Sequence, residues 1–165
     1  RKMTLNLSTQ TDILIDNRLP GLDLGAGTLY PYYAGRSLVN LPSSICRLLG
    51  APDFGAPPLH PDLLGPLAHP RNGAYQHVIL ILADGMGLAL LEAARAAADG
   101  LGVPDPWTDL LARAEQAALT SVVPSTTAAA LSTLWTGQPP SVHAITGYEL
   151  WLKEYGMIVN VRHRE

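Results

Sequence analysis

Two adjacent threonines stand where a helix N-terminus can support chemistry. Thr126 and Thr127 follow Pro124, and the small-residue run TAAALSTLWTG predicts a helix that begins at Thr127 and ends at Gly137. The unpaired N–H groups and the dipole at such an end would stabilise a phosphate without any lysine. A plain N-cap needs only one hydroxyl. The pattern therefore leaves two interpretations of Thr127 open, a helix cap or a nucleophile.

A threonine hydroxyl is a weak nucleophile unless a base or a metal ion activates it. The candidate metal ligand is Asp84, which follows the apolar run VILILA at residues 78–83. Such a run predicts a strand buried on both faces of a parallel sheet, and ligands collect at the carboxyl ends of such strands. Asp is also a good helix cap, so both roles stay open for Asp84.

The order of elements that would position these residues predicts an α/β fold, a parallel sheet flanked by helices. Strands are expected at 77–83, 117–123 and 156–161, and helices at 88–100, 107–116 and 127–137. The first 72 residues are less regular. We expect one or two strands in 3–16, a short helix within 36–50, and an extended proline-rich stretch at 48–70.

Composition narrows the class of protein. The 165 residues are 47% hydrophobic and 15% charged, which is typical of an ordered globular protein. A net charge of −3 predicts no nucleic-acid-binding surface, and a single cysteine, Cys46, excludes an internal disulfide framework. No apolar run approaches the ~20 residues of a membrane span. The opening RKMTLNLSTQ has no signal-peptide core, so a cytoplasmic location is the default expectation.

Together, VILILADGMG and SVVPSTTAAALSTLWTGQPPSVHAITGY resemble the alkaline phosphatase superfamily, most closely its type I phosphodiesterase/nucleotide pyrophosphatase family. In that family a buried strand ends in a metal-binding Asp, and the Thr of a P-x-x-T motif is the nucleophile and also contacts the metal. The resemblance therefore implies that Asp84 is a metal ligand and that Thr127 is the nucleophile and a metal ligand. It also implies two divalent metal ions, zinc in most members, and a small phosphate-ester substrate.

Two positions depart from the family pattern. Tyr148 stands where many members have an Asn that holds a phosphoryl oxygen, and its hydroxyl could donate the same hydrogen bond. We count Tyr148 and Thr126 as substrate-binding candidates. Ala144 replaces the usual glycine after His143, and we interpret His143 as a structural hydrogen-bonding residue.

Aromatic residues and the remaining histidines give weaker signals. Trp107, Trp135 and Trp151 are expected in the core or lining a groove, because no basic residues interleave with them as in a stacking platform. His163 lies in no recognisable ligand motif.

By the same resemblance, residues 1–72 are a leader and residues 73–165 are the N-terminal part of an alkaline-phosphatase-like catalytic domain. A zinc site of this type needs three or more protein ligands, and only Asp84 and Thr127 match the family's set. We therefore expect this chain to supply the nucleophile half of a phosphodiesterase or nucleotide pyrophosphatase, with a second polypeptide segment completing the fold. The alternative is a catalytically silent α/β fragment or a partner-binding module that lacks most of the metal ligands. A Rossmann-type nucleotide domain is disfavoured, because neither G-x-G-x-x-G nor a Walker motif is present.

Overall fold

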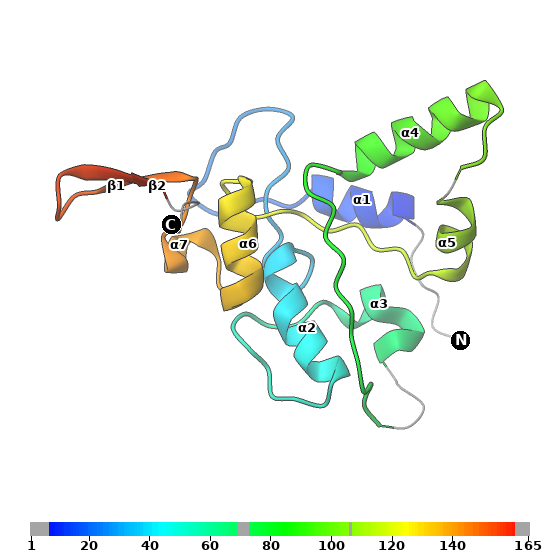
Figure 1. The fold of residues 1–165 in the computed structure, drawn as a ribbon, viewed down its shortest axis with the longest axis horizontal. Helices are drawn as coiled ribbons and strands as arrows, with labels where there is room; N and C mark the ends of the chain where they lie inside the picture. The colour runs from blue at the N-terminus through cyan, green and yellow to red at the C-terminus, as the bar shows by residue number, and fades with distance from the viewer. Residues whose placement is uncertain (1–6, 69–72, 106, 161–165) are drawn as a thin grey trace.

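The computed structural model describes residues 7–68, 73–105 and 107–160, and helices dominate these segments (Figure 1). The elements in chain order are α1 (Leu7–Ile15), η1 (Leu38–Asn40), α2 (Leu41–Leu48), α3 (Pro61–Leu64), η2 (Gly65–Ala68), α4 (Leu88–Leu101), α5 (Thr108–Arg113), α6 (Thr127–Thr136), α7 (Pro140–His143), β1 (Glu149–Leu152) and β2 (Met157–Asn160). Among the described residues, no helix is both long and apolar enough to cross a membrane.

The helices expected from the sequence are present. α2, α5 and α6 lie within the predicted ranges, and α4 begins where predicted but continues to Leu101, one residue past its range, with Gly102 as its C-cap. Helix α6 is followed by Gly137, which adopts the left-handed conformation. The proline-rich stretch is less extended than predicted, because α3 begins directly at Pro61. Proline at the first helical position costs no hydrogen bond, since that N–H has no partner inside a helix.

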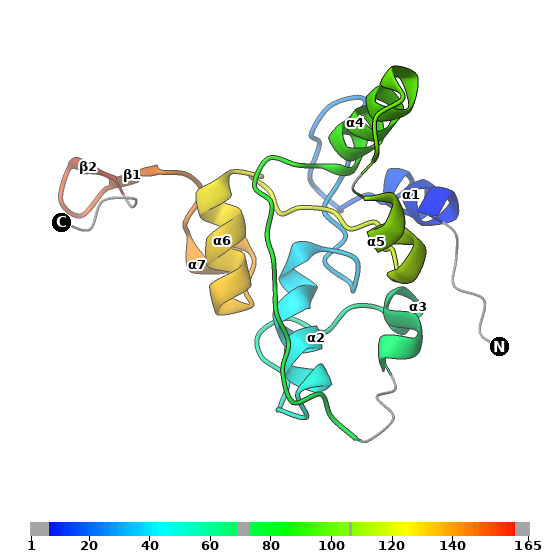
Figure 2. The same cartoon turned by 45° about the vertical axis from the view of Figure 1, so that its right-hand side comes forward.

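The predicted sheet is not what the described residues form. Their sheet has two strands, β1 and β2, which pair antiparallel from Glu149↔Asn160 to Leu152↔Met157. The last predicted strand is therefore present as β2, which pairs antiparallel with β1, and the described residues form no parallel sheet for it to join. Figures 1 and 2 show this hairpin extending away from the body of helices.

Residues 78–83 are extended but belong to no strand in the part of the chain described. Ile79 and Ile81 are 86% and 87% exposed, and the two leucines between and after them are about half exposed. A strand forms only when a neighbour supplies the other half of its hydrogen-bond ladder. The buried strand predicted at 77–83 is therefore not formed, because no partner for it lies among the described residues.

The segment 117–123, which was predicted as a strand, contains one residue that pairs in parallel with another segment. Thr120 forms an isolated parallel bridge with Ser37, built from the N–H of Leu38 to Thr120 and from the N–H of Thr120 to Arg36. The neighbour of this segment is therefore the leader and not residues 78–83. The boundary expected between residues 72 and 73 adjoins 69–72, which lie outside the described residues, and it stays a prediction.

Residues 7–15 form helix α1, where one or two strands were expected within 3–16; residues 3–6 of that range lie outside the described residues. The side chain of Gln10 accounts for this difference. It is almost fully buried, and it makes the hydrogen bonds to a neighbouring segment that the backbone of a strand would otherwise make. Its Oε1 accepts from the N–H of Ala118 at 2.8 Å, and its Nε2 donates to the carbonyl of Gln116 at 3.3 Å. Leu14, one turn further along the same face, is also buried.

Helix α6 packs on η1 and α2 through small side chains. Ala129 and Thr133 are both 0% exposed, and Ser43 on α2 is equally buried. Asn40, at the junction of η1 and α2, uses its whole amide: Nδ2 donates to the carbonyls of Tyr33 and Pro57, and Oδ1 accepts from two backbone N–H groups. Ser43 and Thr133 also have hydrogen-bond partners, so the polar side chains at this contact fix one arrangement of the leader around α6.

The tightest approach lies where the leader meets the end of α6. The N–H of Ala56 donates to the carbonyl of Gly137 at 2.7 Å. A Cβ on Gly55 would overlap the Gly137 carbonyl, and a Cβ on Gly137 would lie 2.7 Å from the carbonyl oxygen of Phe54. Only glycine fits on both sides of this backbone contact.

We therefore expect Gly55→Ala to destabilise the protein more than a glycine replacement made in open space. Gly25 is the matched control, because it has a similar positive φ (86°, against 78° for Gly55) and nothing within 4 Å of its would-be Cβ. Backbone strain alone should cost about 1–2 kcal/mol at Gly25, and overlap should add roughly 1–3 kcal/mol at Gly55. Urea unfolding of both variants measures the difference, and equal losses would contradict the close contact.

Candidate active site

The two adjacent threonines have different partners. Thr126 is the N-cap of α6: its Oγ1 accepts from the N–H of Ala129 at 3.2 Å and donates to the carbonyl of Thr146 at 2.9 Å. Thr127, the first residue of the helix, turns its hydroxyl to Asp84 instead. The capping role thus belongs to Thr126, which leaves the Thr127 hydroxyl facing an acid. The substrate-binding role of Thr126 stays a prediction.

Thr127 and Asp84 are brought together although 43 residues separate them in the chain. The Thr127 Oγ1 donates to the carboxylate, with distances of 3.2 Å to Oδ1 and 3.1 Å to Oδ2. Asp84 is exposed and Thr127 is half-buried, so a ligand can reach both side chains. Gly85 follows with a φ of 71°, a backbone turn that glycine makes without strain.

The first turn of α6 adds backbone donors beside the Thr127 hydroxyl. The Thr126 side chain and carbonyl accept from the N–H groups of Ala129 and Ala130. The N–H groups of Thr127 and Ala128 have no acceptor within the helix, because such an acceptor would lie before its first residue. These two donors and the helix dipole favour negative charge next to the hydroxyl.

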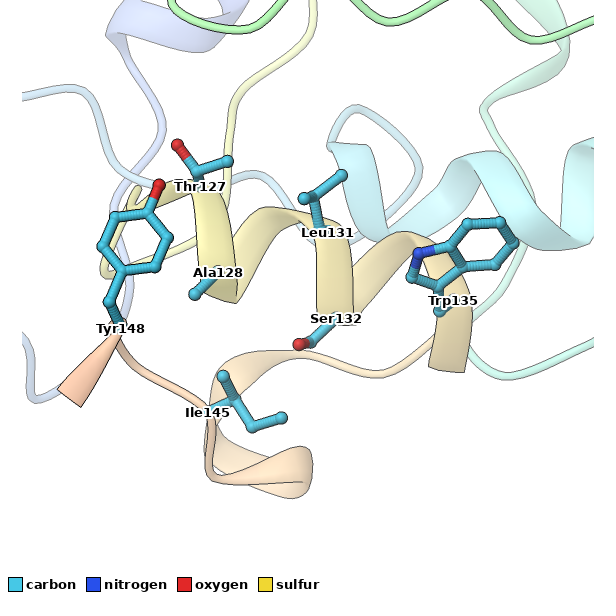
Figure 3. Close-up of a pocket in the computed structure, with 7 residues that line it drawn as sticks. All are labelled: Thr127, Ala128, Leu131, Ser132, Trp135, Ile145 and Tyr148. Carbon is cyan, nitrogen blue, oxygen red and sulfur yellow. The ribbon is translucent and has the colours of Figure 1, made fainter. Parts of the chain in front are cut away.

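A pocket of about 220 Å³ runs along α6 from this end (Figure 3). Its lining is Thr127, Ala128, Leu131, Ser132, Trp135, Ile145 and Tyr148. In Figure 3 the hydroxyls of Tyr148 and Thr127 point to the same side of the pocket, and Trp135 closes the opposite end. Tyr148, a predicted substrate-binding residue, therefore lies beside the predicted nucleophile. Trp135 lines a groove, as the sequence suggested.

Sequence reasoning did not find the rest of this pocket. A signal was present, since residues 128, 131, 132 and 135 recur at the spacing of one helix face. The small-residue pattern predicts the helix itself. It does not show that this face of α6 lines a pocket, because the facing residues Ile145 and Tyr148 come from a later segment of the chain.

The chain segment that carries Ile145 and Tyr148 is tied back to α6 through His143. The N–H of Ile145 donates to His143 Nδ1 at 3.1 Å, so the proton of the neutral ring lies on Nε2, which is 3.1 Å from Thr133 Oγ1. This confirms His143 as a structural hydrogen-bonding residue. Partial burial lowers its pKa, an effect that backbone hydrogen bonds partly oppose.

The geometry of Thr127 and Asp84 fits part of a metal site. Two oxygen ligands of one tetrahedral zinc ion, each bound at about 2.1 Å, lie roughly 3.4 Å apart, close to the separations found here. The described residues contain no group of three or more His, Cys, Asp or Glu side chains that could hold a metal. Asp84 and Thr127 could supply two oxygen donors to a metal ion, and a zinc site of this type would need at least one protein ligand more. His163 lies outside the described residues.

Comparison with known proteins adds one match. A family profile described as type I phosphodiesterase / nucleotide pyrophosphatase matches residues 78–165, a range that contains both Asp84 and Thr127. No curated protein matches the chain. No solved structure matches it either.

The backbone conformation at Ala144 explains why the family pattern has a glycine after the histidine. Ala144 is the only non-glycine residue with positive φ (61°) among those described, and it ends α7. We expect Ala144→Gly to stabilise the protein by about 0.5–1 kcal/mol, because relief of ~1–2 kcal/mol of strain exceeds the added entropy of the unfolded chain. Ala130→Gly, inside α6, is the control and should cost about 1 kcal/mol. Thermal unfolding of both variants would contradict this if both lost stability.

We expect protonation of His143 to lower the stability of the folded protein in mild acid. The pKa of His143 in the folded protein lies below its ordinary value of 6.5, so the unfolded chain binds the proton more readily. The contribution to stability is complete above about pH 6.5 and is lost as the pH falls toward the lowered pKa. The slope from one proton is at most about 1.4 kcal/mol per pH unit.

The measurement is the urea unfolding midpoint at pH 7.5 and pH 5.5. We expect His143→Gln, which cannot be protonated in this range, to reduce the difference between the two midpoints. His77→Gln, at an exposed position, should leave that difference unchanged. An unaltered pH dependence in His143→Gln would show that this imidazole is not the group responsible.

Proposed function

The chain belongs to the type I phosphodiesterase/nucleotide pyrophosphatase family of the alkaline phosphatase superfamily, and from this we propose that it supplies the nucleophile of a metal-dependent hydrolase of phosphodiesters or nucleotide pyrophosphates. The observation that carries the proposal is the contact between the Thr127 hydroxyl and the Asp84 carboxylate at a helix N-terminus. The family match covers hydrolases of this class. The roles of the two residues are our inference from their geometry.

In the proposed reaction the Thr127 oxygen attacks phosphorus and forms a phospho-threonine, while the bond from phosphorus to the leaving oxygen breaks. The hydroxyl proton leaves toward Asp84, to which it is already directed. The leaving oxygen keeps the bonding electron pair and takes a proton from solvent. Water then attacks phosphorus and loses a proton to solvent, the bond from phosphorus to the Thr127 oxygen breaks, and Asp84 returns its proton to that oxygen as the product leaves.

The N-terminus of α6 would stabilise the negative charge that develops on the phosphoryl oxygens during this attack. The N–H groups of Thr127 and Ala128 face the position next to the attacking oxygen, and the helix dipole adds to their effect. Tyr148 lines the same end of the pocket, and in this proposal its hydroxyl would donate a hydrogen bond to a phosphoryl oxygen. This is the role that an Asn has in many family members.

Asp84 and Thr127 would hold one of the two divalent metal ions typical of the family, zinc in most members. When bound, such an ion polarises the hydroxyl and neutralises charge on the phosphoryl group. These residues would supply two oxygen donors, and because the described residues hold no group of three or more His, Cys, Asp or Glu side chains that could bind a metal, we infer that further ligands come from a segment outside them.

The exposed apolar segment 78–83 supports the proposal that a further polypeptide segment completes the fold. It leads directly to Asp84, and a strand with apolar residues on both faces is normally covered on both. The same feature favours the alternative function, a catalytically silent module in which this surface binds a protein partner.

Covalent trapping tests the proposal. The full-length protein is incubated with zinc and bis(p-nitrophenyl) phosphate, quenched in acid and mapped by mass spectrometry. We expect a p-nitrophenylphosphoryl adduct on Thr127, formed with release of one p-nitrophenolate and absent in Thr127→Ala, together with a loss of turnover of at least about 10³-fold in that variant. Asp84→Asn, which keeps the side-chain shape, should lose both the adduct and measurable zinc binding in equilibrium dialysis.

Thr126→Val is the matched control for the neighbouring hydroxyl. It should lower stability by about 1 kcal/mol through loss of the N-cap and still form the adduct on Thr127. An adduct on Thr126, or turnover that persists in Thr127→Ala, would rule out Thr127 as the nucleophile. Absence of any adduct or zinc binding in the wild-type protein would favour the silent module.

A further inference from the structure

We propose that the pocket along α6 receives an apolar aromatic ester group of the substrate, so that the preferred substrates are aryl phosphodiesters and not nucleotides. The inference rests on the proposed function, because it takes Thr127 as the point where phosphorus lies. It adds the part of the substrate that extends away from that point.

The position of the pocket gives the direction of this group. The lining begins at Thr127 and Tyr148 and ends at Trp135, eight residues along the same helix. At 1.5 Å per residue this is about 12 Å, the reach of a phosphate with one aromatic group attached. The volume of about 220 Å³ lies below the ~300 Å³ at which drug-sized pockets begin. A single or fused ring therefore suits it better than a nucleoside.

The chemistry of the lining favours an apolar occupant. No charged side chain lines the pocket, and away from the Thr127 end its polar side-chain groups are the Ser132 hydroxyl and the Trp135 indole N–H. A ribose or a base placed here would leave most of its donors and acceptors without partners, which costs binding energy. Leu131, Ile145 and Trp135 offer apolar contacts instead, and Trp135 is 81% exposed, so its ring is available to stack.

Small residues create the hollow itself. Ala128 and Ser132 lie one turn apart on the helix, between the larger side chains of Tyr148 and Trp135 (Figure 3). A large side chain at either position would fill the space. Ser132→Phe is therefore a blocking variant, and Trp135→Ala removes the far wall.

Binding of two phosphonate probes that differ only in the ring tests the proposal. The probes are monomethyl 1-naphthylmethylphosphonate and monomethyl methylphosphonate, measured by isothermal titration calorimetry on the full-length protein with zinc. We expect the naphthyl probe to bind about tenfold tighter, the factor that burial of a small aromatic group predicts. Trp135→Ala should remove most of this preference, and Ser132→Phe should abolish it, with the affinity for the methyl probe unchanged.

Trp151→Ala is the matched control, because Trp151 is also exposed (63%) but lies on β1, outside the pocket. It should keep the preference for the naphthyl probe. Equal binding of the two probes by the wild-type protein, no binding of either, or the same loss in Trp151→Ala as in Trp135→Ala would overturn the proposal. So would tighter binding of the thymidine ester of methylphosphonic acid than of the naphthyl probe.

The two proposals fail separately. A protein that forms the Thr127 adduct but binds both probes equally keeps the proposed function and loses the aromatic specificity. A protein that forms no adduct but shows a Trp135-dependent preference for the naphthyl probe loses the function, and the pocket then remains an apolar binding site.

Discussion

The hydrogen bond from the N–H of Ala129 to the Thr126 side chain is the interaction on which the site depends. It makes Thr126 the cap and so places Thr127 one residue later, inside the first turn. There the Thr127 hydroxyl points to Asp84, and the Thr127 and Ala128 N–H groups are left for an anion. A cap one residue later would use Thr127 in the structural role, and no hydroxyl would face the acid.

The leader holds α6 along one face and at its C-terminal end. Ala129 and Thr133 are buried where α6 packs on η1 and α2, and the contact between Gly55 and Gly137 fixes the C-terminal end. On the outer face, His143 and Thr146 tie the returning chain to the helix and so bring Ile145 and Tyr148 to the pocket. The polar core makes this arrangement specific, since a shift of α6 would break hydrogen bonds that water cannot replace.

How well the sequence predicted each element depended on where its determining interactions lie. The start and stop signals of helix α6 lie next to it in the sequence, a threonine before its first residue and a glycine after its last. Its predicted bounds, 127–137, agree with the observed bounds to within one residue. The Asp84–Thr127 pair was predicted through the family motif, which encodes a contact across 43 residues that local patterns do not contain. The strands at 78–83 and 117–123 depended on partners, and a hydrophobic run does not say which segment supplies them. Gln10 illustrates the same limit, because its bonds to residues 116–118 make a helix where alternation predicted a strand.

The exposed segment 78–83 and the incomplete ligand set meet at Asp84. Asp84 is the last residue of an extended stretch with no ladder partner among the described residues, so its carboxylate is held chiefly by the Thr127 hydroxyl. A neighbouring strand would fix the backbone that carries Asp84, and the ordering cost of bringing its two oxygens to a metal would then already be met. By linkage, a metal ion bound at Asp84 and Thr127 would in turn favour pairing of residues 78–83. In the proposed enzyme, completion of the sheet and completion of the metal site are therefore one coupled event.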